Sequence, residues 1–210
     1  MSIYQLKPAF QNLLRPLVAR LARACVTANQ VTVAACVVSV VLGAALYFAQ
    51  PPAWAYALVP LWMFLRMAFN AVDGMLAREH GQQTPLGAFL NELTDVVSDA
   101  ALYLPFVWLL PNPPIWMALV IFLSALSEYA GALGTSVGAS RRYDGPMGKS
   151  DRAFAFGALG LLAALGWASP TWTVWVLPVM AALLVLTMVR RVRGALAELS
   201  ALKTGAGTKH

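Results

Sequence analysis

The chain has 210 residues, of which 60% are hydrophobic and only 11% are charged, with a formal net charge of +6. A soluble domain carries about 25% charged residues, so this composition excludes an ordinary soluble globular protein. The mean hydropathy of +0.67 and the long apolar blocks instead predict an all-α integral membrane protein. The excess of basic residues does not indicate nucleic-acid binding, because multi-pass membrane proteins collect lysine and arginine in their cytoplasmic loops.

The first expected element is an amphipathic helix within residues 1–26. Its basic residues Arg15, Arg20 and Arg23 lie on the side opposite to its apolar residues, which are Phe10, Leu13, Leu14, Leu17, Val18 and Leu21. This pattern predicts a juxtamembrane helix that lies on the cytoplasmic leaflet. The segment Thr27-Ala28-Asn29 then offers N-cap residues for a first membrane span.

Six apolar stretches follow, each long enough to cross a bilayer with about 20 helical residues. They cover residues 30–49, 54–78, 86–109, 115–138, 152–168 and 172–193. Prolines mark the breaks between them, as at Pro51-Pro52 and Ser169-Pro170. We therefore expect a six-transmembrane-helix bundle over residues 27–196, preceded by the amphipathic helix and followed by a cytoplasmic tail at 197–210.

The distribution of charge predicts the orientation of the bundle. The links near residues 50–53, 109–114 and 168–171 contain no charged residue, whereas the links on the other side are basic. Basic links remain in the cytoplasm, so both termini are expected there, in a multi-pass protein of the inner (cytoplasmic) membrane.

Polar side chains share a face on each of two neighbouring spans. They are Arg66, Asn70 and Asp73 on the second span, whose face also includes the small residue Ala77, and Asn91, Asp95 and Asp99 on the third. A charged group inside a membrane segment costs about 2.5–3.5 kcal/mol, which makes it a functional candidate. Convergent carboxylate and amide oxygens predict a site for a metal ion and phosphate. The alternative is that the acids pair with Arg66 or Arg78 and the small residues only pack helices.

Arg66, Asp99 and Glu128 are expected at a similar depth in the bilayer, counted from the tryptophans at the outer ends of their spans. An unpaired charge at this depth is costly. We therefore expect a buried structural pairing of Arg66 with Asp99 or with Glu128.

The link between the fourth and fifth spans gathers four cations before a helix whose expected N-cap is Ser150. These cations are Arg141, Arg142, Lys149 and Arg152. Lysine and arginine beside a helix N-terminus are typical of an anion site. An ordinary basic cytoplasmic loop is an equally good explanation.

The run from residue 70 to residue 95 resembles the signature of the CDP-alcohol phosphatidyltransferases, D-x2-D-G-x2-A-R-x8-G-x3-D-x3-D. The matching residues are Asp73, Gly74, Ala77, Arg78, Gly87 and Asp95. The start of the first span, with Thr27, Asn29 and Thr32, and the six-span layout are similar as well. Asn70 and Asn91, however, occupy the positions of the first and third signature aspartates.

The resemblance implies a set of roles for these residues. Asp73, Asp95, Asn70 and Asn91 would hold Mg²⁺ or Mn²⁺, and Asp95 would be the catalytic base. Gly74, Ala77, Arg78 and Gly87 would bind the CDP and phosphate groups. The four cations between the fourth and fifth spans would bind the acceptor substrate. Because two charges are missing, the sequence leaves open whether the site holds one ion, two or none.

The implied reaction is transfer of a phosphatidyl group from CDP-diacylglycerol to a small alcohol, either free or phosphorylated, with release of CMP. The resemblance also implies a homodimer. The main alternative is a weak or inactive relative that binds CDP-lipid as a membrane scaffold, which Asn70 and Asn91 favour. A small transporter is disfavoured, because the acids cluster at one face and the sequence has no visible inverted repeat.

Overall fold

The computed structural model describes residues 3–206, with side chains described for residues 8–202. Every regular element in this range is helical. The α-helices are α1 (Ile3–Arg23), α2 (Ala28–Ala49), α3 (Leu58–Glu79), α4 (Pro85–Tyr103), α5 (Pro114–Ser136), α6 (Lys149–Ala164), α7 (Pro170–Thr173) and α8 (Val176–Ala206). Two short 3₁₀ turns, η1 (Ala53–Ala57) and η2 (Leu104–Trp108), precede α3 and extend α4. The expectation of an all-helical protein is confirmed.

Capping residues explain where the helices begin. Thr27 is the N-cap of α2, as expected, and it exchanges two hydrogen bonds with Gln30 in a capping box. Thr84 accepts a hydrogen bond from the Gly87 N–H at the start of α4. The expected cap of α6 at Ser150 was wrong. Gly148 is the N-cap there, and its N–H donates to the Asp151 carboxylate at 2.9 Å, because an acid in the first turn satisfies the free amides of a helix start.

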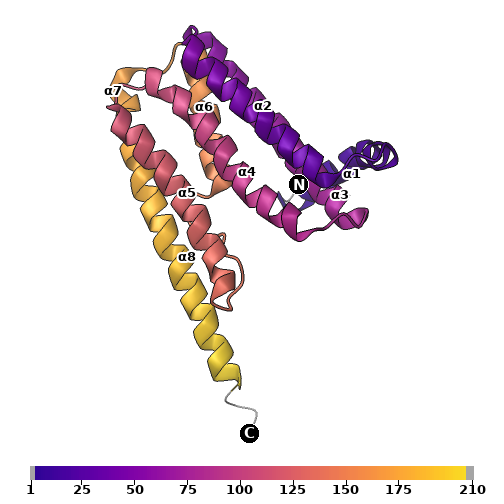
Figure 1. The fold of residues 1–210 in the computed structure, drawn as a ribbon. Coiled ribbons are helices and arrows are strands. Elements are labelled where there is room, and N and C mark those ends of the chain that lie inside the picture. The colour runs from indigo at the N-terminus through magenta and orange to yellow at the C-terminus, as the bar shows by residue number, and fades with distance from the viewer. Residues whose placement is uncertain (1–2, 207–210) are drawn as a thin grey trace.

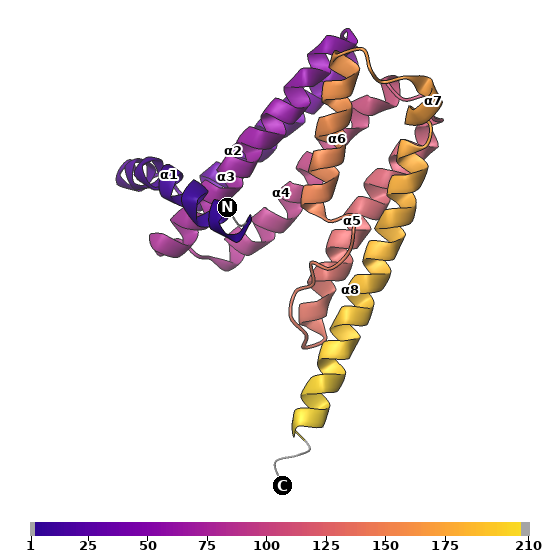
Figure 2. The ribbon, with the colours of Figure 1, turned by 180° about the vertical axis from the view of Figure 1, so that it is seen from behind.

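The bundle consists of two helix pairs joined by α4 and α6 (Figures 1 and 2). α2 packs along α4 and also against α3, α6 packs along α3, and α5 packs along α8. The helices lie close together near α7 and spread apart toward α1 (Figure 1).

A buried core closes the opposite end of the bundle. Tyr103 stacks on Phe156 with ring centroids 3.9 Å apart, and Phe106 contacts the edge of Phe156. Tyr56 donates a hydrogen bond from its hydroxyl to the Pro105 carbonyl. These aromatic contacts join η1, η2, α4 and α6, so they fix the spacing of the helices that carry the polar residues.

Four helical stretches within the described residues are long and apolar enough to cross a membrane. They are Ala28–Ala49, Ala53–Glu79, Pro114–Ser136 and Pro170–Leu202. Two helices of the bundle fall short of this description for a visible reason: α4 carries three carboxylates, and α6 has only 16 residues. The structure therefore supports the expectation of a multi-pass membrane protein.

Two segments lie at the margins of the bundle. α1 projects from its side (Figures 1 and 2) and contacts α3 through Val18, which is fully buried beside Val72 and Leu76. At the other end of the chain, α8 continues through residue 196 to Ala206. Residues 207–210 of the expected tail lie outside the described residues.

Candidate functional site

The signature residues line one cavity of about 660 Å³, which we call the signature pocket. It lies between the start of α2, the second half of α3 and the first half of α4. Its walls include all of the expected metal and phosphate ligands except Asp95, namely Asn70, Asp73, Gly74, Ala77, Arg78, Gly87 and Asn91. The structure therefore brings together two helix segments that the sequence separates by a turn.

Asp73 and Arg78 carry opposite charges in this pocket. Asp73 is buried, and its Oδ2 accepts a hydrogen bond of 2.7 Å from the Thr32 hydroxyl on α2. The Arg78 guanidinium folds over Gly74, where a β-carbon would lie 3.0 Å from Nη2, so a larger residue at this position would require the guanidinium to shift. Arg78 forms no ion pair with any of the residues whose side chains the structure describes. It is thus a cation available to an anionic ligand.

A second cavity, of about 390 Å³, lies between α4, α5, α6 and α8, and we call it the charged pocket. Three of the four cations expected from the α5–α6 link, Arg141, Lys149 and Arg152, line it. Arg142 does not: it pairs with Asp144 at 2.7 Å and with Glu198 at 3.0 Å. The hydrogen bond from Arg142 lowers the pKa of the Asp144 carboxyl, so this pair is ionised at neutral pH.

Asp95 and Asp99, in the wall of the charged pocket, take part in a chain of ion pairs. Arg66 bonds to Asp95 Oδ1 at 2.9 Å and to Asp99 Oδ1 at 2.6 Å, so its expected pairing with Asp99 is confirmed. Lys149 pairs with Asp95 Oδ2, and Arg152 pairs with Asp99 Oδ2 at 3.0 Å. These contacts connect α3, α4 and α6 through charged groups that are mostly buried.

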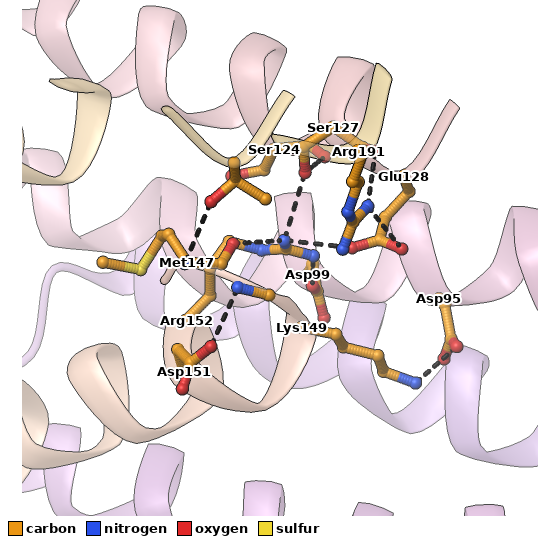
Figure 3. A network of polar contacts seen from close by, with 12 residues as sticks. Asp95, Asp99, Ser124, Ser127, Glu128, Met147, Lys149, Asp151, Arg152 and Arg191 are labelled. Atoms are coloured by element: carbon orange, nitrogen blue, oxygen red, sulfur yellow. Dashed lines mark hydrogen bonds and ion pairs between the residues drawn. The ribbon is translucent and has the colours of Figure 1, made fainter. Parts of the chain in front are cut away.

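Glu128, on α5, contacts three arginines. It lies 3.1 Å from Arg152, 3.4 Å from Arg191 and 3.7 Å from Arg141. Figure 3 shows Arg152 and Arg191 converging on Glu128, while Lys149 reaches across to Asp95. Arg141 also pairs with Glu92 on α4. The cations of the charged pocket thus have carboxylate partners from α4 and α5.

A third cavity, of about 700 Å³, lies between α3 and α6 and is mainly apolar. Its walls include Met63, Met67 and Phe154, and we call it the apolar groove. It shares Asn70 with the signature pocket and Lys149 with the charged pocket. The signature and charged pockets in turn share Asn91.

The four expected metal ligands offer oxygen atoms only. No cluster of three or more His, Cys, Asp or Glu side chains able to hold a metal occurs among residues 8–202. This agrees with the two asparagines, because Asp73 and Asp95 are the only carboxylates of the set. Such a donor set fits Mg²⁺ or Mn²⁺, because small hard cations bind one or two carboxylates and complete their coordination with substrate phosphates and water.

Several residues of these cavities were not identified from the sequence as site residues. Thr32 belongs to the signature-like start of the first span, but the sequence does not predict its hydrogen bond to Asp73. Glu128 is one of the two alternative partners expected for Arg66, whereas it pairs with arginines from the α5–α6 link, α6 and α8. For Arg191 the sequence leaves two roles open, a part in the anion site or an anchor of the last span; the residue is 1% exposed and lines the charged pocket. In the sequence, these contacts are indicated by a charged residue within an apolar stretch. Such a residue predicts a buried ion pair but does not identify the partner.

The fold and these cavities define a class, a helical multi-pass membrane protein with a polar site suited to metal and phosphate. Residues 25–189 match the model of the CDP-alcohol phosphatidyltransferase family. The chain is also 47% identical over 175 residues to the inner membrane protein YnbA of Escherichia coli, covering 83% of this chain and 85% of that protein. The chain therefore belongs to the CDP-alcohol phosphatidyltransferase family.

More distant relatives and solved structures agree with this membership. Archaetidylinositol phosphate synthase of Aeropyrum pernix is 29% identical over 54% of this chain and 64% of its own length. Phosphatidylinositol phosphate synthase of Mycobacterium tuberculosis, solved with manganese and citrate, has a TM-score of 0.71 at 22% identity and covers 86% of this chain and 88% of that one. The same enzyme solved with CDP-DAG bound has a TM-score of 0.70 and covers 86% and 92%. These structures share the fold.

Proposed function

We propose that this chain carries out its family's reaction, metal-dependent transfer of a phosphatidyl group from CDP-diacylglycerol to a small alcohol, through its three adjoining cavities. The signature pocket binds the CDP group, the apolar groove binds the acyl chains, and the charged pocket binds the acceptor. The observation that carries this proposal is that the cavities adjoin in pairs, through Asn91, Asn70 and Lys149. A reaction that joins a nucleotide, a lipid and an alcohol needs three such sites around one point.

The proposed CDP site rests on charge and space in the signature pocket. Arg78, without a carboxylate partner, is positioned to bind a phosphate oxygen, and Gly74, Ala77 and Gly87 keep the walls free of bulky side chains. Asp73, Asp95, Asn70 and Asn91 would hold Mg²⁺ or Mn²⁺. When bound, such a cation offsets negative charge on the transferring phosphoryl group. The Mycobacterium tuberculosis enzyme has been solved with manganese and with CDP-DAG, which supports this assignment.

Asp95 is the proposed general base. The acceptor hydroxyl gives its proton to Asp95 as its oxygen attacks the β-phosphorus of CDP-diacylglycerol. A new P–O bond forms to the alcohol, the bond from that phosphorus to the bridging oxygen breaks, and CMP leaves with that oxygen. Arg66 holds Asp95 Oδ1 and so orients the carboxylate. Lys149 contacts Oδ2 and is partly exposed, so it is free to exchange this contact for a substrate oxygen.

The apolar groove supports lateral binding of the lipid. It is lined by Met63, Phe64 and Met67 from α3 and by Phe154 and Leu161 from α6, and its polar end reaches Asn70 and Lys149. A diacylglycerol chain matches this lining, while its head group would point toward the pockets. CDP-diacylglycerol would thus enter sideways from the bilayer.

We further propose that α2, α3, α4, α5, α6 and α8 all cross the membrane, in one domain over residues 27–196. The acids of α4 and the cations of α6 pair with each other inside the bundle, which reduces the cost of placing these two helices there. α1 would lie on the cytoplasmic leaflet, because its apolar side chains Leu13 and Leu17 are exposed and could enter the membrane surface. Both termini would be in the cytoplasm by the positive-inside rule, and the protein would form a homodimer in the inner membrane.

A scaffold that binds CDP-lipid without turnover is the second candidate. It is favoured by Asn70 and Asn91, which remove two carboxylates, and by the two cations that already occupy Asp95. This candidate predicts nucleotide binding with no release of CMP.

The experiment that separates these candidates uses purified full-length protein with CDP-diacylglycerol, Mg²⁺ or Mn²⁺ and a panel of alcohols, with CMP as the measured product. We expect metal-dependent CMP release that falls by about 10²–10⁴-fold in Asp95→Asn. Asp144→Asn, which removes a carboxylate outside the three cavities, is the matched control. Nucleotide binding without turnover on any acceptor would instead favour the scaffold.

A further inference from the structure

We infer, from the charges of the charged pocket and on the basis of the proposed function, that the acceptor is an uncharged polyol rather than a phosphorylated alcohol or an amino alcohol. The pocket has one more acid than base. Its acids are Glu92, Asp95, Asp99, Glu128 and Asp151, and its bases are Arg141, Lys149, Arg152 and Arg191. Arg66, which does not line the pocket, pairs with both Asp95 and Asp99 and brings the cluster into charge balance. No cation is therefore left in excess to attract a phosphate monoester.

Every cation of the charged pocket already has a carboxylate partner. Arg141 pairs with Glu92, Lys149 with Asp95, Arg152 with Asp99, and Arg191 with Glu128. The Arg152 and Arg191 side chains are 1% and 2% exposed. A phosphate that captured these arginines would remove partners from two largely buried carboxylates, Asp99 and Glu128, which is unfavourable.

The N-terminus of α6, beside the charged pocket, is already bonded to a carboxylate of the chain. A helix start commonly binds phosphate through free backbone N–H groups. At α6, the Gly148 N–H donates to Asp151 Oδ2 at 2.9 Å, so the chain's own carboxylate fills this position. An incoming phosphate would have to displace Asp151 and would meet its charge.

The signature pocket provides the contrast. Its Arg78 has no ion pair within the described side chains, and Asp73 is the only carboxylate in its wall. The fold thus reserves an unpaired cation for the pocket that receives the pyrophosphate and neutralises the cations of the pocket that receives the acceptor. The unpaired Arg78 therefore favours the anionic CDP-lipid in the signature pocket, and the paired cations favour an uncharged acceptor in the charged pocket.

An amino alcohol is also disfavoured, because each carboxylate that would attract its ammonium group is already bonded. Hydroxyl groups suit the lining better, since each one both donates and accepts hydrogen bonds. Three of the ion-paired side chains are partly exposed and carry both signs: those of Glu92, Lys149 and Arg141 are 35%, 32% and 26% exposed. A polyol can bond to all three without moving a charge.

The test compares acceptors in matched pairs with the full-length protein, CDP-diacylglycerol and Mn²⁺. The pairs are glycerol with glycerol 3-phosphate and myo-inositol with inositol 1-phosphate, and serine and ethanolamine represent the amino alcohols. We expect kcat/KM for CMP release to be at least about tenfold higher for the uncharged member of a pair. Preference for a phosphorylated alcohol or for an amino alcohol would overturn the inference.

A binding measurement decides the acceptor class even without turnover. Glu92→Gln removes the closer of the two carboxylates that contact Arg141 and leaves only the 3.7 Å contact with Glu128. This variant should therefore bind radiolabelled inositol 1-phosphate at least about tenfold more tightly than the wild type. Glu79→Gln removes an acid from the exposed pair with Arg15, outside all three cavities, and should bind as the wild type does. Equal binding by the wild type and Glu92→Gln would refute the inference. Absence of CMP release with every acceptor would count against the proposed function alone.

Discussion

Lys149, at the first turn of α6, forms an ion pair with Asp95 on α4. This contact lies where the charged pocket meets the apolar groove, because Lys149 lines both cavities. The lysine side chain is 32% exposed, whereas the Arg66 side chain that holds the other oxygen of Asp95 is 5% exposed. The two cations therefore differ in mobility: Arg66 fixes Asp95, and Lys149 can exchange its contact when a substrate binds.

The first prediction concerns Arg66, whose buried guanidinium bonds to both Asp95 and Asp99. Arg66→Leu should destabilise the protein by about 3–5 kcal/mol, because it leaves two carboxylates without their main partner. The thermal midpoint in detergent should fall clearly, and the protein that remains folded should bind substrate with nearly unchanged affinity. Arg15→Leu breaks an exposed pair and should change stability by less than about 1 kcal/mol. An unchanged midpoint with lost activity would show that Arg66 is catalytic rather than structural.

A second prediction follows from the bond between Thr32 and Asp73. Thr32→Val keeps the shape of the side chain but removes the donor to Asp73 Oδ2. If Asp73 is a metal ligand, the affinity for Mn²⁺ should fall by about 10–100-fold, as it does when other metal ligands lose their hydrogen-bond partners. Electron paramagnetic resonance of free Mn²⁺ measures this directly. Ser39→Ala, which removes a buried hydroxyl bonded to Trp62 away from the cavities, should leave Mn²⁺ binding unchanged.

The two asparagines of the signature give a third prediction. The double substitution Asn70→Asp with Asn91→Asp adds two carboxylates to the wall of the signature pocket and should raise the affinity for Mn²⁺ by about tenfold or more, because hard cations bind more tightly as the number of charged oxygens grows. Gln83→Glu adds an acid at the exposed rim of the same pocket and serves as the control. Equal Mn²⁺ affinity in the double variant and the wild type would place the metal ligands elsewhere.

The fourth prediction tests the close approach of α2 and α4. A β-carbon on Gly43 would lie 2.1 Å from the Ala101 carbonyl oxygen, so Gly43→Ala should force the helices apart and cost about 1–3 kcal/mol of stability. Since α4 carries Asp95, activity should fall with stability. Ala45→Val enlarges an exposed position on the same helix and should change stability by less than about 0.5 kcal/mol. A fully stable Gly43→Ala protein would refute the tight packing.

Local chemistry made much of the fold predictable. The apolar stretches and the prolines located the starts of the long helices of the bundle to within a few residues, and Thr27 predicted the start of α2. The end of α8 differs, because this helix continues to Ala206 beyond the expected end of the last span at residue 193. The start of α6 differs from the expectation of a Ser150 cap. Gly148 is the N-cap, and the Asp151 carboxylate in the first turn accepts a hydrogen bond from the Gly148 N–H, which suits the positive end of the helix dipole.

The sequence by itself determined that oxygen-bearing side chains occupy one face of α3 and one face of α4, because helical spacing is a local property. It also determined that Arg66 needs a carboxylate partner at its own depth. Only the tertiary structure decided that Glu128 contacts Arg141, Arg152 and Arg191, while Arg142 turns away to Asp144 and Glu198. Ion pairs such as Arg191 with Glu128 join residues far apart in the chain, and their geometry is set by how the helices pack rather than by any spacing along the sequence.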